Sequence, residues 1–479
     1  MLLEVFEMPP TASYPGALLA VILLASCSTM AEADLVITGA TLIDGSGAEP
    51  REGTTIVVRE GRITMVVPDG AVTPPEDAAV IDATGKHVIP GLADMHLHFS
   101  LGAPLPRRPD ETDVVLKRAL YYGVTTALQV GGRDASAERI RELRAQRAAG
   151  AVDAPYIYGT GGHLTLQGTH PIYTIFPPEV REAADSIAAA TPLDEPANLY
   201  PLGIGLSLIR TEEAARKAVR ERAEGGMHAI KITVESGPTP FGDDHPQMPV
   251  DMIRAIVDEA TRHGLRVFAH VTSLDELEAA LEGGAAGIVH AVNDEPLPAG
   301  VHGDEMAATG FTVVPTLVLF AEPGDFDDPF LRLTVSDREI AALAETAYRE
   351  SRRQRWECCA ASHEQLANMG MLHKRGVPIA VGTDTGNPYI FPGYSVHREL
   401  ALLVEAGMTP MEAITAATLR AAEMLDEEDE FGTIEPGKRA DLLILGANPL
   451  EDIRNTRSLE VVISEGRVVD REALLREVR

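Results

Sequence analysis

The feature that most constrains the fold is a repeated order of strand, loop and helix between residues 91 and 430. Residues 250–262 carry apolar side chains at helical spacing, and residues 265–269 follow as an apolar strand. Ser273, with Glu276 three residues later, forms the capping box of the next helix. This order predicts an α/β fold. Because polar residues stand at the ends of several strands, it favours a (β/α)₈ TIM barrel over an open doubly wound sheet.

Both ends of the chain have a different pattern, with short alternating strands separated by glycine and aspartate. Residues 31–90 contain the turn Glu60-Gly61-Arg62, and residues 431–479 contain the similar turn Glu465-Gly466-Arg467. These patterns are typical of β-hairpins. We therefore expect the two terminal parts to pair into one small β-sandwich domain beside the barrel.

Residues 1–27 resemble a bacterial lipoprotein signal rather than part of the fold. An apolar run ends at Leu24-Ala25-Ser26-Cys27, which predicts cleavage before Cys27 and acylation of that residue. The segment before the run carries Glu4 and Glu7 and no lysine or arginine, so a cytoplasmic protein with an apolar N-terminus is the alternative. The main expectation is a periplasmic or outer-membrane-anchored lipoprotein that meets the membrane only through its lipid.

Charge and cysteine content narrow the range of partners. The chain has 41 lysines and arginines against 72 aspartates and glutamates, a net charge of −31. So large an acidic excess repels a phosphate backbone, which argues against a nucleic-acid partner. The three cysteines, Cys27, Cys358 and Cys359, are too few for a disulfide framework or a thiolate metal cage. A small-molecule substrate is the expected partner, and a homo-oligomer is compatible with the sequence.

Ligand-type residues gather at the ends of the predicted strands. His96 and His98 stand at i and i+2 of an apolar strand, so both imidazoles project to one side and can reach one cation. His270, His290 and Asp384 each follow a further strand. A single residue of this kind is more often part of a loop or the core. Four such strand ends in one barrel predict a metal site instead.

Lys231 is the next element of this site. It stands between Ile230 and Ile232 in a buried strand, where burial favours the neutral amine. A neutral amine can add CO₂ to give a carbamate, an anionic oxygen ligand that can bridge two cations. The alternative is a buried lysine in a salt bridge with Glu235 or another carboxylate.

Together these motifs resemble those of the amidohydrolase superfamily, near its imidazolonepropionase-like and metal-dependent dipeptidase (prolidase-like) branches. The resemblance covers nearly all of the chain after residue 31. The motifs that carry it are residues 88–98, residues 123–126, residues 230–232, the strand-end histidines His270 and His290, residues 382–384 and residues 432–442.

The resemblance implies a role for each ligand-type residue. The first metal ion would be held by His96, His98 and Asp384, and the second by His270 and His290. A carboxylated Lys231 would bridge the ions, and Asp384 would also act as the base. The expected cofactors are two divalent ions, with zinc the first candidate, and the CO₂-derived carbamate. The implied reaction is hydrolysis of an amide or peptide-like C–N bond in a small substrate, such as a dipeptide or an N-acyl amino acid, by a hydroxide shared between the ions.

Residues of the substrate side are predicted from the third strand and the loop after it. His163 ends a Gly-Gly-His run like that of dipeptidase-like relatives, which implies contact with a substrate carbonyl or carboxylate. His170 lies in the long loop that follows, which is interpreted as a pocket wall. Two departures argue against a standard dipeptide specificity: Leu128-Gln129 replaces an Arg-Asp, and His270-Val271-Thr272 replaces a His-Ala-Tyr.

Two other functional classes stay open. The first is a mononuclear deaminase or a cyclic amidohydrolase. A mononuclear deaminase would not need Lys231, and it usually has an acidic residue where this chain has Ser273. A noncatalytic metal-binding lipoprotein would be expected to lack a ligand, whereas all six positions are filled.

Three interpretations concern residues beside the predicted site. Asp94 either orients His96 or supports the strand. The run His397-Arg398-Glu399 is interpreted as a set of solvated helix residues outside the site. Cys358 and Cys359 are interpreted as packing residues.

Overall fold

The computed structural model describes residues 34–101, 110–133, 135–236, 245–292, 296–297, 301–321, 326–343 and 361–479. Cys27 lies outside these residues, as do Cys358 and Cys359, so the lipid anchor and the cysteine packing stay predictions. Within the described parts of the chain, no helix combines the length and the apolar character needed to cross a membrane.

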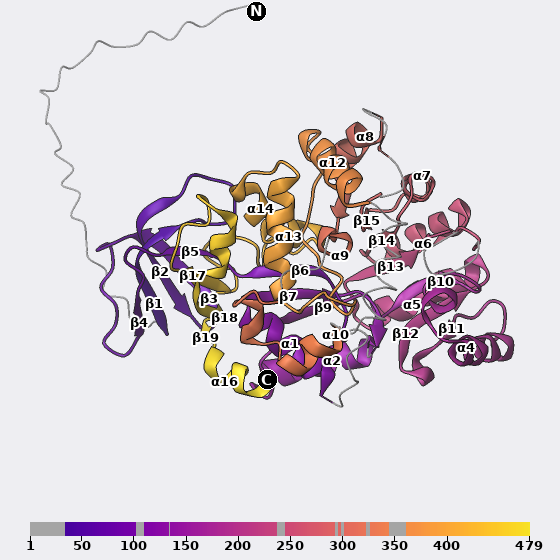
Figure 1. Ribbon diagram of the computed structural model, residues 1–479, viewed down its shortest axis with the longest axis horizontal. Helices are drawn as coiled ribbons and strands as arrows, with labels where there is room; N and C mark the ends of the chain where they lie inside the picture. Colours follow the sequence, from indigo (N-terminus) through magenta and orange to yellow (C-terminus); the bar gives the residue numbers. More distant parts are fainter. Residues whose placement is uncertain are drawn as a thin grey trace, which may run out of the picture.

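Both ends of the chain build one eight-stranded sheet, at the left of Figure 1. Its order is β19-β18-β17-β5-β1-β2-β3, with β4 beside β1. The strands are β1 (Leu35–Leu42), β2 (Arg51–Arg59), β3 (Arg62–Pro68), β4 (Ala79–Asp82), β5 (His87–Pro90), β17 (Leu442–Leu445), β18 (Leu459–Ser464) and β19 (Arg467–Val468). The two ends meet where β5 and β17 pair antiparallel, with His87 opposite Leu445.

The two terminal parts therefore join edge to edge through backbone hydrogen bonds, as one sheet. Pairing of the termini was expected and is observed, whereas a sandwich of two facing sheets is not confirmed. The predicted turns are present: Glu60-Gly61 links β2 to β3 and Glu465-Gly466 links β18 to β19, with positive φ at all four residues. Two consecutive positive φ values are the mark of a tight hairpin turn that suits twisted strands.

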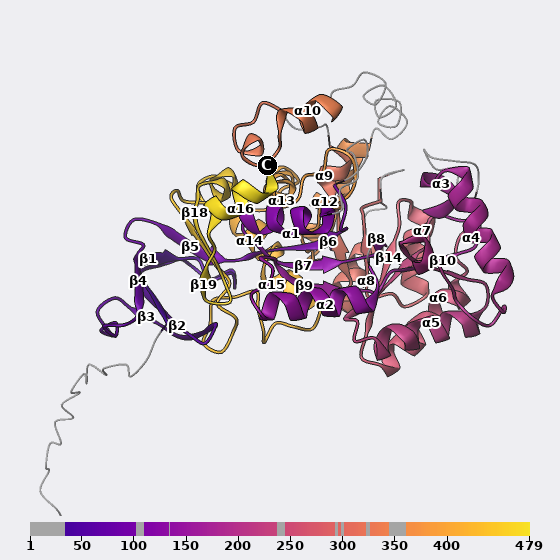
Figure 2. The same ribbon diagram turned by 90° about the horizontal axis from the view of Figure 1, so that it is seen from below.

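The middle of the chain forms two sheets of mainly parallel strands with helices packed around them (Figures 1 and 2). The first contains β6 (Leu92–Leu97), β7 (Val124–Gln129) and β9 (Tyr156–Gly159). The second contains the parallel strands β12 (Ile204–Ile209), β10 (His163–Leu166), β13 (Ala229–Thr233), β14 (Arg266–His270), β15 (Gly287–Val289) and β16 (Thr312–Val314). β8 (Gly132–Arg133) and β11 (Ala197–Asn198) pair antiparallel with β12.

Backbone hydrogen bonds join these two sheets at both sides. On one side, His228 N donates to Gly159 O at 2.9 Å. On the other, residues 379–381 lie between β16 and β6 and bond to both. The architecture is an α/β fold consistent with a TIM barrel, but the strands do not form one closed barrel. Gly161 and Gly162, both at positive φ, interrupt the third strand between β9 and β10, and residues 379–385 make only isolated bridges.

The helix predicted at residues 250–262 is present, and so is the helix predicted to follow the Ser273 cap. The longer helices are α1 (Glu111–Tyr121), α2 (Ala137–Ala148), α4 (Pro178–Ala190), α5 (Glu212–Glu224), α6 (Val250–Arg262), α7 (Leu274–Glu282), α8 (Val301–Thr309), α12 (Ala361–Lys374), α13 (Tyr394–Glu405) and α16 (Arg471–Val478). The shorter ones in the described chain are α3 (Ile172–Ile175), α9 (Leu317–Phe320), α10 (Asp337–Leu343), α14 (Pro410–Ala416) and α15 (Leu419–Met424). Ser273 and Glu276 form the capping box at the start of α7, as predicted. The C-terminal helix α16 packs on α1 (Figure 2).

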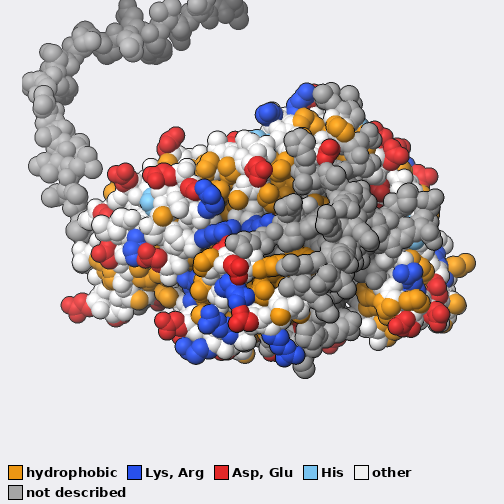
Figure 3. Space-filling model, in the orientation of Figure 1, with side chains coloured by type: hydrophobic (Ala, Val, Ile, Leu, Met, Phe, Trp, Pro, Cys, Tyr) orange, Lys and Arg blue, Asp and Glu red, His pale blue; other side chains and the backbone are white. Residues whose placement is uncertain are grey.

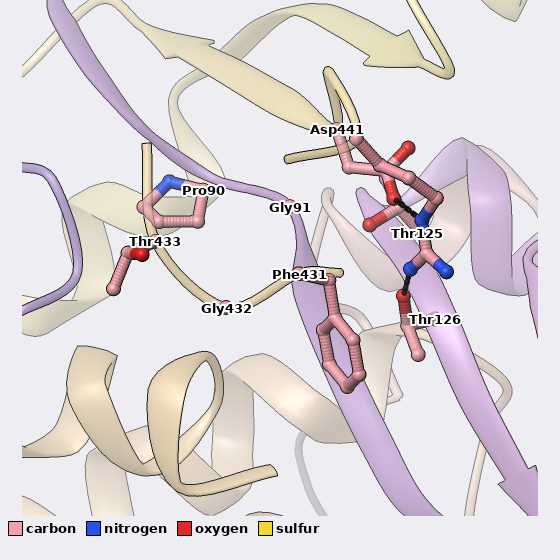
Figure 4. A pocket seen from close by; sticks show the side chains of 9 residues that line it. Pro90, Gly91, Thr125, Thr126, Phe431, Gly432, Thr433 and Asp441 are labelled. Atoms are coloured by element: carbon pink, nitrogen blue, oxygen red, sulfur yellow. Dashed lines mark hydrogen bonds and ion pairs between the residues drawn. The ribbon is translucent and has the colours of Figure 1, made fainter. Parts of the chain in front are cut away.

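Arg439 holds the terminal sheet to the β6-β7-β9 sheet. Its buried guanidinium pairs with Asp441 at 3.0 Å and donates to Thr126 Oγ1 at 2.8 Å, and both of these partners are labelled in Figure 4. It also lies over the rings of Tyr156 and Phe431. This junction is near the N-terminal ends of β6 and β7, the end that stabilises such folds rather than the end that carries their chemistry. The motif of residues 432–442 is therefore structural.

Charged side chains of both signs share the face of the molecule in Figure 3. Lysine and arginine are interspersed with aspartate and glutamate there, so the coloured part of this face offers no broad basic surface.

Candidate metal centre

The structure brings the six predicted ligands to one end of the parallel strands. They are His96 of β6 and His98 after it, Lys231 of β13, His270 of β14, His290 after β15 and Asp384 after residues 379–383. All are buried except His98, which is partly exposed. The C-terminal ends of parallel strands are where this class of fold holds its reactive groups.

Asp384 is the centre of the first group of ligand atoms. Its Oδ1 lies 3.0 Å from His98 Nε2 and 3.4 Å from His96 Nε2, and its Oδ2 lies 3.9 Å from His290 Nε2. Oδ1 makes no hydrogen bond within the described residues, although it is buried. Two imidazole nitrogens and a carboxylate oxygen that converge in this way are a typical zinc ligand set.

His270 and His290 form a second group. Nδ1 of His270 and Nε2 of His290 face each other at 3.1 Å, and the two rings are nearly perpendicular, with centroids 4.4 Å apart. Burial lowers the pKa of His96, His270 and His290, that of His270 to about 3, and the charge of nearby Lys231 adds to this. The imidazoles are therefore neutral, which is the form that binds metal ions.

Lys231 is fully buried, and its Nζ makes neither a hydrogen bond nor an ion pair with any residue that the structure describes. The predicted alternative, a salt bridge with Glu235, is therefore not formed. Burial lowers the pKa of Lys231 to about 7, against the opposing charges of Asp384 and Glu235. A substantial fraction of the amine is neutral at neutral pH, as addition of CO₂ requires.

The second ring nitrogen of two ligand histidines is held by a hydrogen bond. Nδ1 of His98 lies 2.7 Å from Gly131 O, and Nδ1 of His290 lies 2.7 Å from Thr316 Oγ1. Such hydrogen bonds fix the tautomer and the ring orientation of a metal ligand. Nε2 of His270 lies 2.7 Å from Glu235 Oε2, an ion-pair distance without the angle of a hydrogen bond.

Asp94 holds the backbone on both sides of the first group. Its buried carboxylate accepts hydrogen bonds from His96 N at 3.1 Å, Thr383 N at 3.0 Å and Thr383 Oγ1 at 2.6 Å. It contacts the His96 backbone rather than the imidazole, and it ties β6 to the residue before Asp384.

Backbone strain is concentrated around the same residues. His290, Thr316 and Asp384 have φ of 69°, 49° and 60°, in the left-handed region that non-glycine residues rarely adopt. Strain of this kind persists only where the surrounding structure holds it, and it clusters at functional sites. Beside Thr316, the buried carboxylate of Glu399 accepts hydrogen bonds from Leu317 N at 2.9 Å and Val318 N at 2.7 Å, and it holds this turn in place.

The interpretation of His397 and Glu399 as solvated residues is wrong, because both are fully buried in α13. His397 contacts Thr456 Oγ1 and Tyr122 O, each at 2.9 Å, and so has a structural role. The helical pattern marks α13 correctly but does not show that a second layer of structure covers this face.

Glu399 makes one part of the stability depend on pH. Burial raises its pKa to about 8 from 4.5, so between these values the folded state keeps a proton that the unfolded chain has lost. By linkage, this contribution to stability falls as pH rises through that window. Glutamine at position 399 cannot ionise. The thermal midpoint of the wild type should therefore fall relative to that of Glu399→Gln as the pH rises from 5 to 8. Calorimetry at both pH values measures this, and a constant difference would contradict it.

Both predicted substrate residues lie beside the ligands. His163 begins β10, opposite Lys231 in the strand register, and its ring lies 6.0 Å from that of His98. Its two ring nitrogens are buried and have no partner within the described residues. His170 stacks on His270 with centroids 4.8 Å apart, and its Nδ1 lies 2.7 Å from Thr174 Oγ1 and 3.3 Å from Glu235 Oε2.

Sequence reasoning missed the supporting roles of Glu235, Thr316 and Glu399. Glu235 had a usable signal, because it follows Lys231 by four residues and side chains at i and i+4 of a strand share a face. Thr316 and Glu399 carried no such signal, since their contacts depend on elements distant in the sequence.

Comparison with known proteins relates the chain to one family. A model of the amidohydrolase family matches residues 87–469. An ochratoxinase of Aspergillus niger is 28% identical over 443 residues, covering 88% of this chain and 82% of the relative. An imidazolonepropionase of Symbiobacterium thermophilum is 27% identical over 447 residues, covering 87% of this chain and 92% of the relative. A crystal structure of a Xaa-Pro dipeptidase with bound methionine superposes with a TM-score of 0.70 at 25% identity, covering 91% of this chain and 99% of that one.

Proposed function

The chain belongs to the amidohydrolase family, and we propose that it hydrolyses an amide or peptide-like C–N bond in a small substrate such as a dipeptide or an N-acyl amino acid. The observation that carries this proposal is the convergence of two groups of imidazoles, one of them around Asp384, beside a buried lysine without a partner among the described residues. The Xaa-Pro dipeptidase among the similar structures supports a peptide-like substrate.

The residues fit two divalent cations. The buried Nζ of Lys231 and Oδ1 of Asp384 have no hydrogen-bond partners in the described parts of the chain, and the donors around them suit zinc. In the proposed assignment, His96, His98 and Asp384 would hold one ion, and His270 and His290 would hold the other. Lys231, carboxylated by CO₂, would be a ligand of both. We also propose that the two parallel sheets together make the barrel of this family, closed through residues 379–385.

The chemistry divides between the ions and the protein. When bound, two divalent ions lower the pKa of a water molecule toward ~7 and polarise the substrate carbonyl. Asp384 accepts the proton that the water loses and delivers it to the leaving nitrogen, because an amine leaves poorly without a proton. His163 binds the substrate oxygen through one of its free ring nitrogens. Burial keeps its pKa well below the ordinary value for histidine, so it is neutral and can donate a single hydrogen bond.

Metal content and hydrolysis test this proposal together. Protein purified without chelator and supplemented with zinc and bicarbonate should contain close to two ions per chain by elemental analysis. It should also release amino acids from a panel of dipeptides and N-acyl amino acids. Chelator should remove both the ions and the activity, and zinc with bicarbonate should restore them. A plateau at one ion after supplementation would contradict the bridged pair, and two ions without turnover on any amide would contradict the proposed reaction.

A further inference from the structure

The second nitrogen of His270 differs from those of the other ligand histidines in what it contacts. His98 and His290 each reach a neutral oxygen, of Gly131 and Thr316. Among the described residues, the charged group that His270 Nε2 approaches is the Glu235 carboxylate, with Oε2 at 2.7 Å, an ion-pair distance whose angle is not that of a hydrogen bond. A carboxylate behind a metal-bound imidazole holds the ring more strongly than a neutral acceptor and makes the facing nitrogen a better donor.

Glu235 is placed for this contact by its strand. Lys231, Thr233 and Glu235 alternate along β13 and its extension, so their side chains share one face. Thr233 lies opposite His270 in the register of β13 and β14, and Val234 N donates to His270 O at 3.1 Å. Glu235 is 4% exposed, so water does not compete for its carboxylate.

A second buried carboxylate, Glu276, fastens the two loops that carry this pair. It accepts hydrogen bonds from Ser236 N at 2.8 Å, directly after Glu235, and from Thr272 N at 2.6 Å, two residues after His270. Glu276 also closes the capping box of α7. The approach of Glu235 to His270 is therefore held by the fold and does not depend on the rotamer of one side chain alone.

Formal charge gives a reason for a carboxylate at this place. In the proposed centre, two divalent ions carry four positive charges, and the carboxylated Lys231 and Asp384 each supply one negative charge. Glu235 adds a third negative charge beside the His270 ligand. In a buried site an opposite charge at short range favours cation binding much more than it would in water.

We propose that Glu235 is a positioning residue that orients His270 and strengthens binding of the ion held by His270 and His290. This inference rests on the proposed two-ion centre. Glu235 Oε2 also lies 3.3 Å from Nδ1 of His170, whose ring stacks on His270. The same carboxylate therefore fixes a residue of the predicted substrate wall relative to the second ion.

The test is stepwise removal of metal from the zinc-loaded enzyme with increasing dipicolinate, followed by elemental analysis. In Glu235→Gln the amide keeps the shape and loses the charge, so the more weakly held ion should leave at about 10- to 100-fold lower chelator activity. The other ion should leave as in the wild type. Glu259→Gln is the matched control, because this carboxylate pairs with Arg262 at 2.7 Å on α6, away from the centre. Its removal curve should match the wild type.

Thermal unfolding of the metal-free proteins separates positioning from damage to the fold. Glutamine keeps the shape of the Glu235 side chain, so metal-free Glu235→Gln should unfold at a thermal midpoint close to that of the metal-free wild type. A carboxylate needed for the fold itself would instead lower the midpoint of the variant.

Each other outcome has a defined meaning. Unchanged removal of both ions, or equal weakening of both, would overturn the positioning role. Three ions in the wild type and two in Glu235→Gln would also overturn it, because His170, Glu235 and His270 would then hold a cation of their own. A single ion in the wild type would count against the proposed two-ion function, and the shift between wild type and Glu235→Gln would still test Glu235 on the ion that remains.

Discussion

Lys231→Ala should lose nearly all activity and most of its metal. Changes to groups that only support ligands commonly cost 10–100-fold in affinity or activity, so removal of the bridging ligand should reduce kcat by more than ~10²-fold. The physical reason is that the Nζ of Lys231 is buried and has no hydrogen-bond partner among the described residues. Steady-state kinetics and elemental analysis of the purified variant measure both losses.

Chemical rescue distinguishes a carboxylated lysine from a structural one. Acetate or propionate can enter the space left in Lys231→Ala and supply the missing oxygen ligand, so metal content and turnover should recover with rising concentration of acid. Lys231→Met fills that space and is the matched control, which the acids should not rescue. Retention of both ions and near-normal turnover in Lys231→Ala would contradict the carbamate. The site would then be reinterpreted as one built on His96, His98, His270 and Asp384.

Asp384→Asn should remove the proposed base and leave the surrounding fold unchanged. Asparagine tolerates the left-handed backbone that Asp384 adopts at φ 60°, so the loop should keep its shape. The amide oxygen can still face a cation, but it cannot accept a proton. Because general-base catalysis contributes typically 10²–10⁴-fold, we expect kcat to fall by about that factor while KM changes little.

The matched control for this variant is the same change at the other end of the strands. Asp441 is a buried carboxylate paired with Arg439 at 3.0 Å, remote from the ligand histidines. Asp441→Asn should lower the thermal midpoint and leave kcat close to that of the wild type. If Asp384→Asn kept wild-type kcat with both ions bound, Asp384 would not be the base.

Local signals in the sequence were enough for many individual elements. The helix predicted at residues 250–262 is α6, and the capping box of Ser273 and Glu276 begins α7, because periodicity and caps act within a few residues. The turns Glu60-Gly61 and Glu465-Gly466 follow from the same kind of short-range signal. Five of the six ligand-type residues were predicted from their place at the end of an apolar strand, and Lys231 from its place inside one.

Pairings over long distances needed the three-dimensional structure. The terminal strands form one sheet because β5 pairs with β17 across most of the chain, and the predicted sandwich is not confirmed. Which surface of α13 is covered likewise depends on how distant segments pack, so the burial of His397 and Glu399 was not predictable from their helix.

By itself, the sequence determined which residue types stand at the strand ends and therefore that a metal-dependent hydrolase was the best interpretation. Only the tertiary structure decided how those residues are held. The packed fold brings Thr316 within hydrogen-bond distance of His290, and Glu399 within hydrogen-bond distance of Leu317 N. It also brings the Glu235 carboxylate within ion-pair distance of His270. The reason is physical: strand and helix formation respond to neighbours a few positions away, whereas the tautomer and orientation of a buried imidazole depend on a partner that only the packed fold brings within reach.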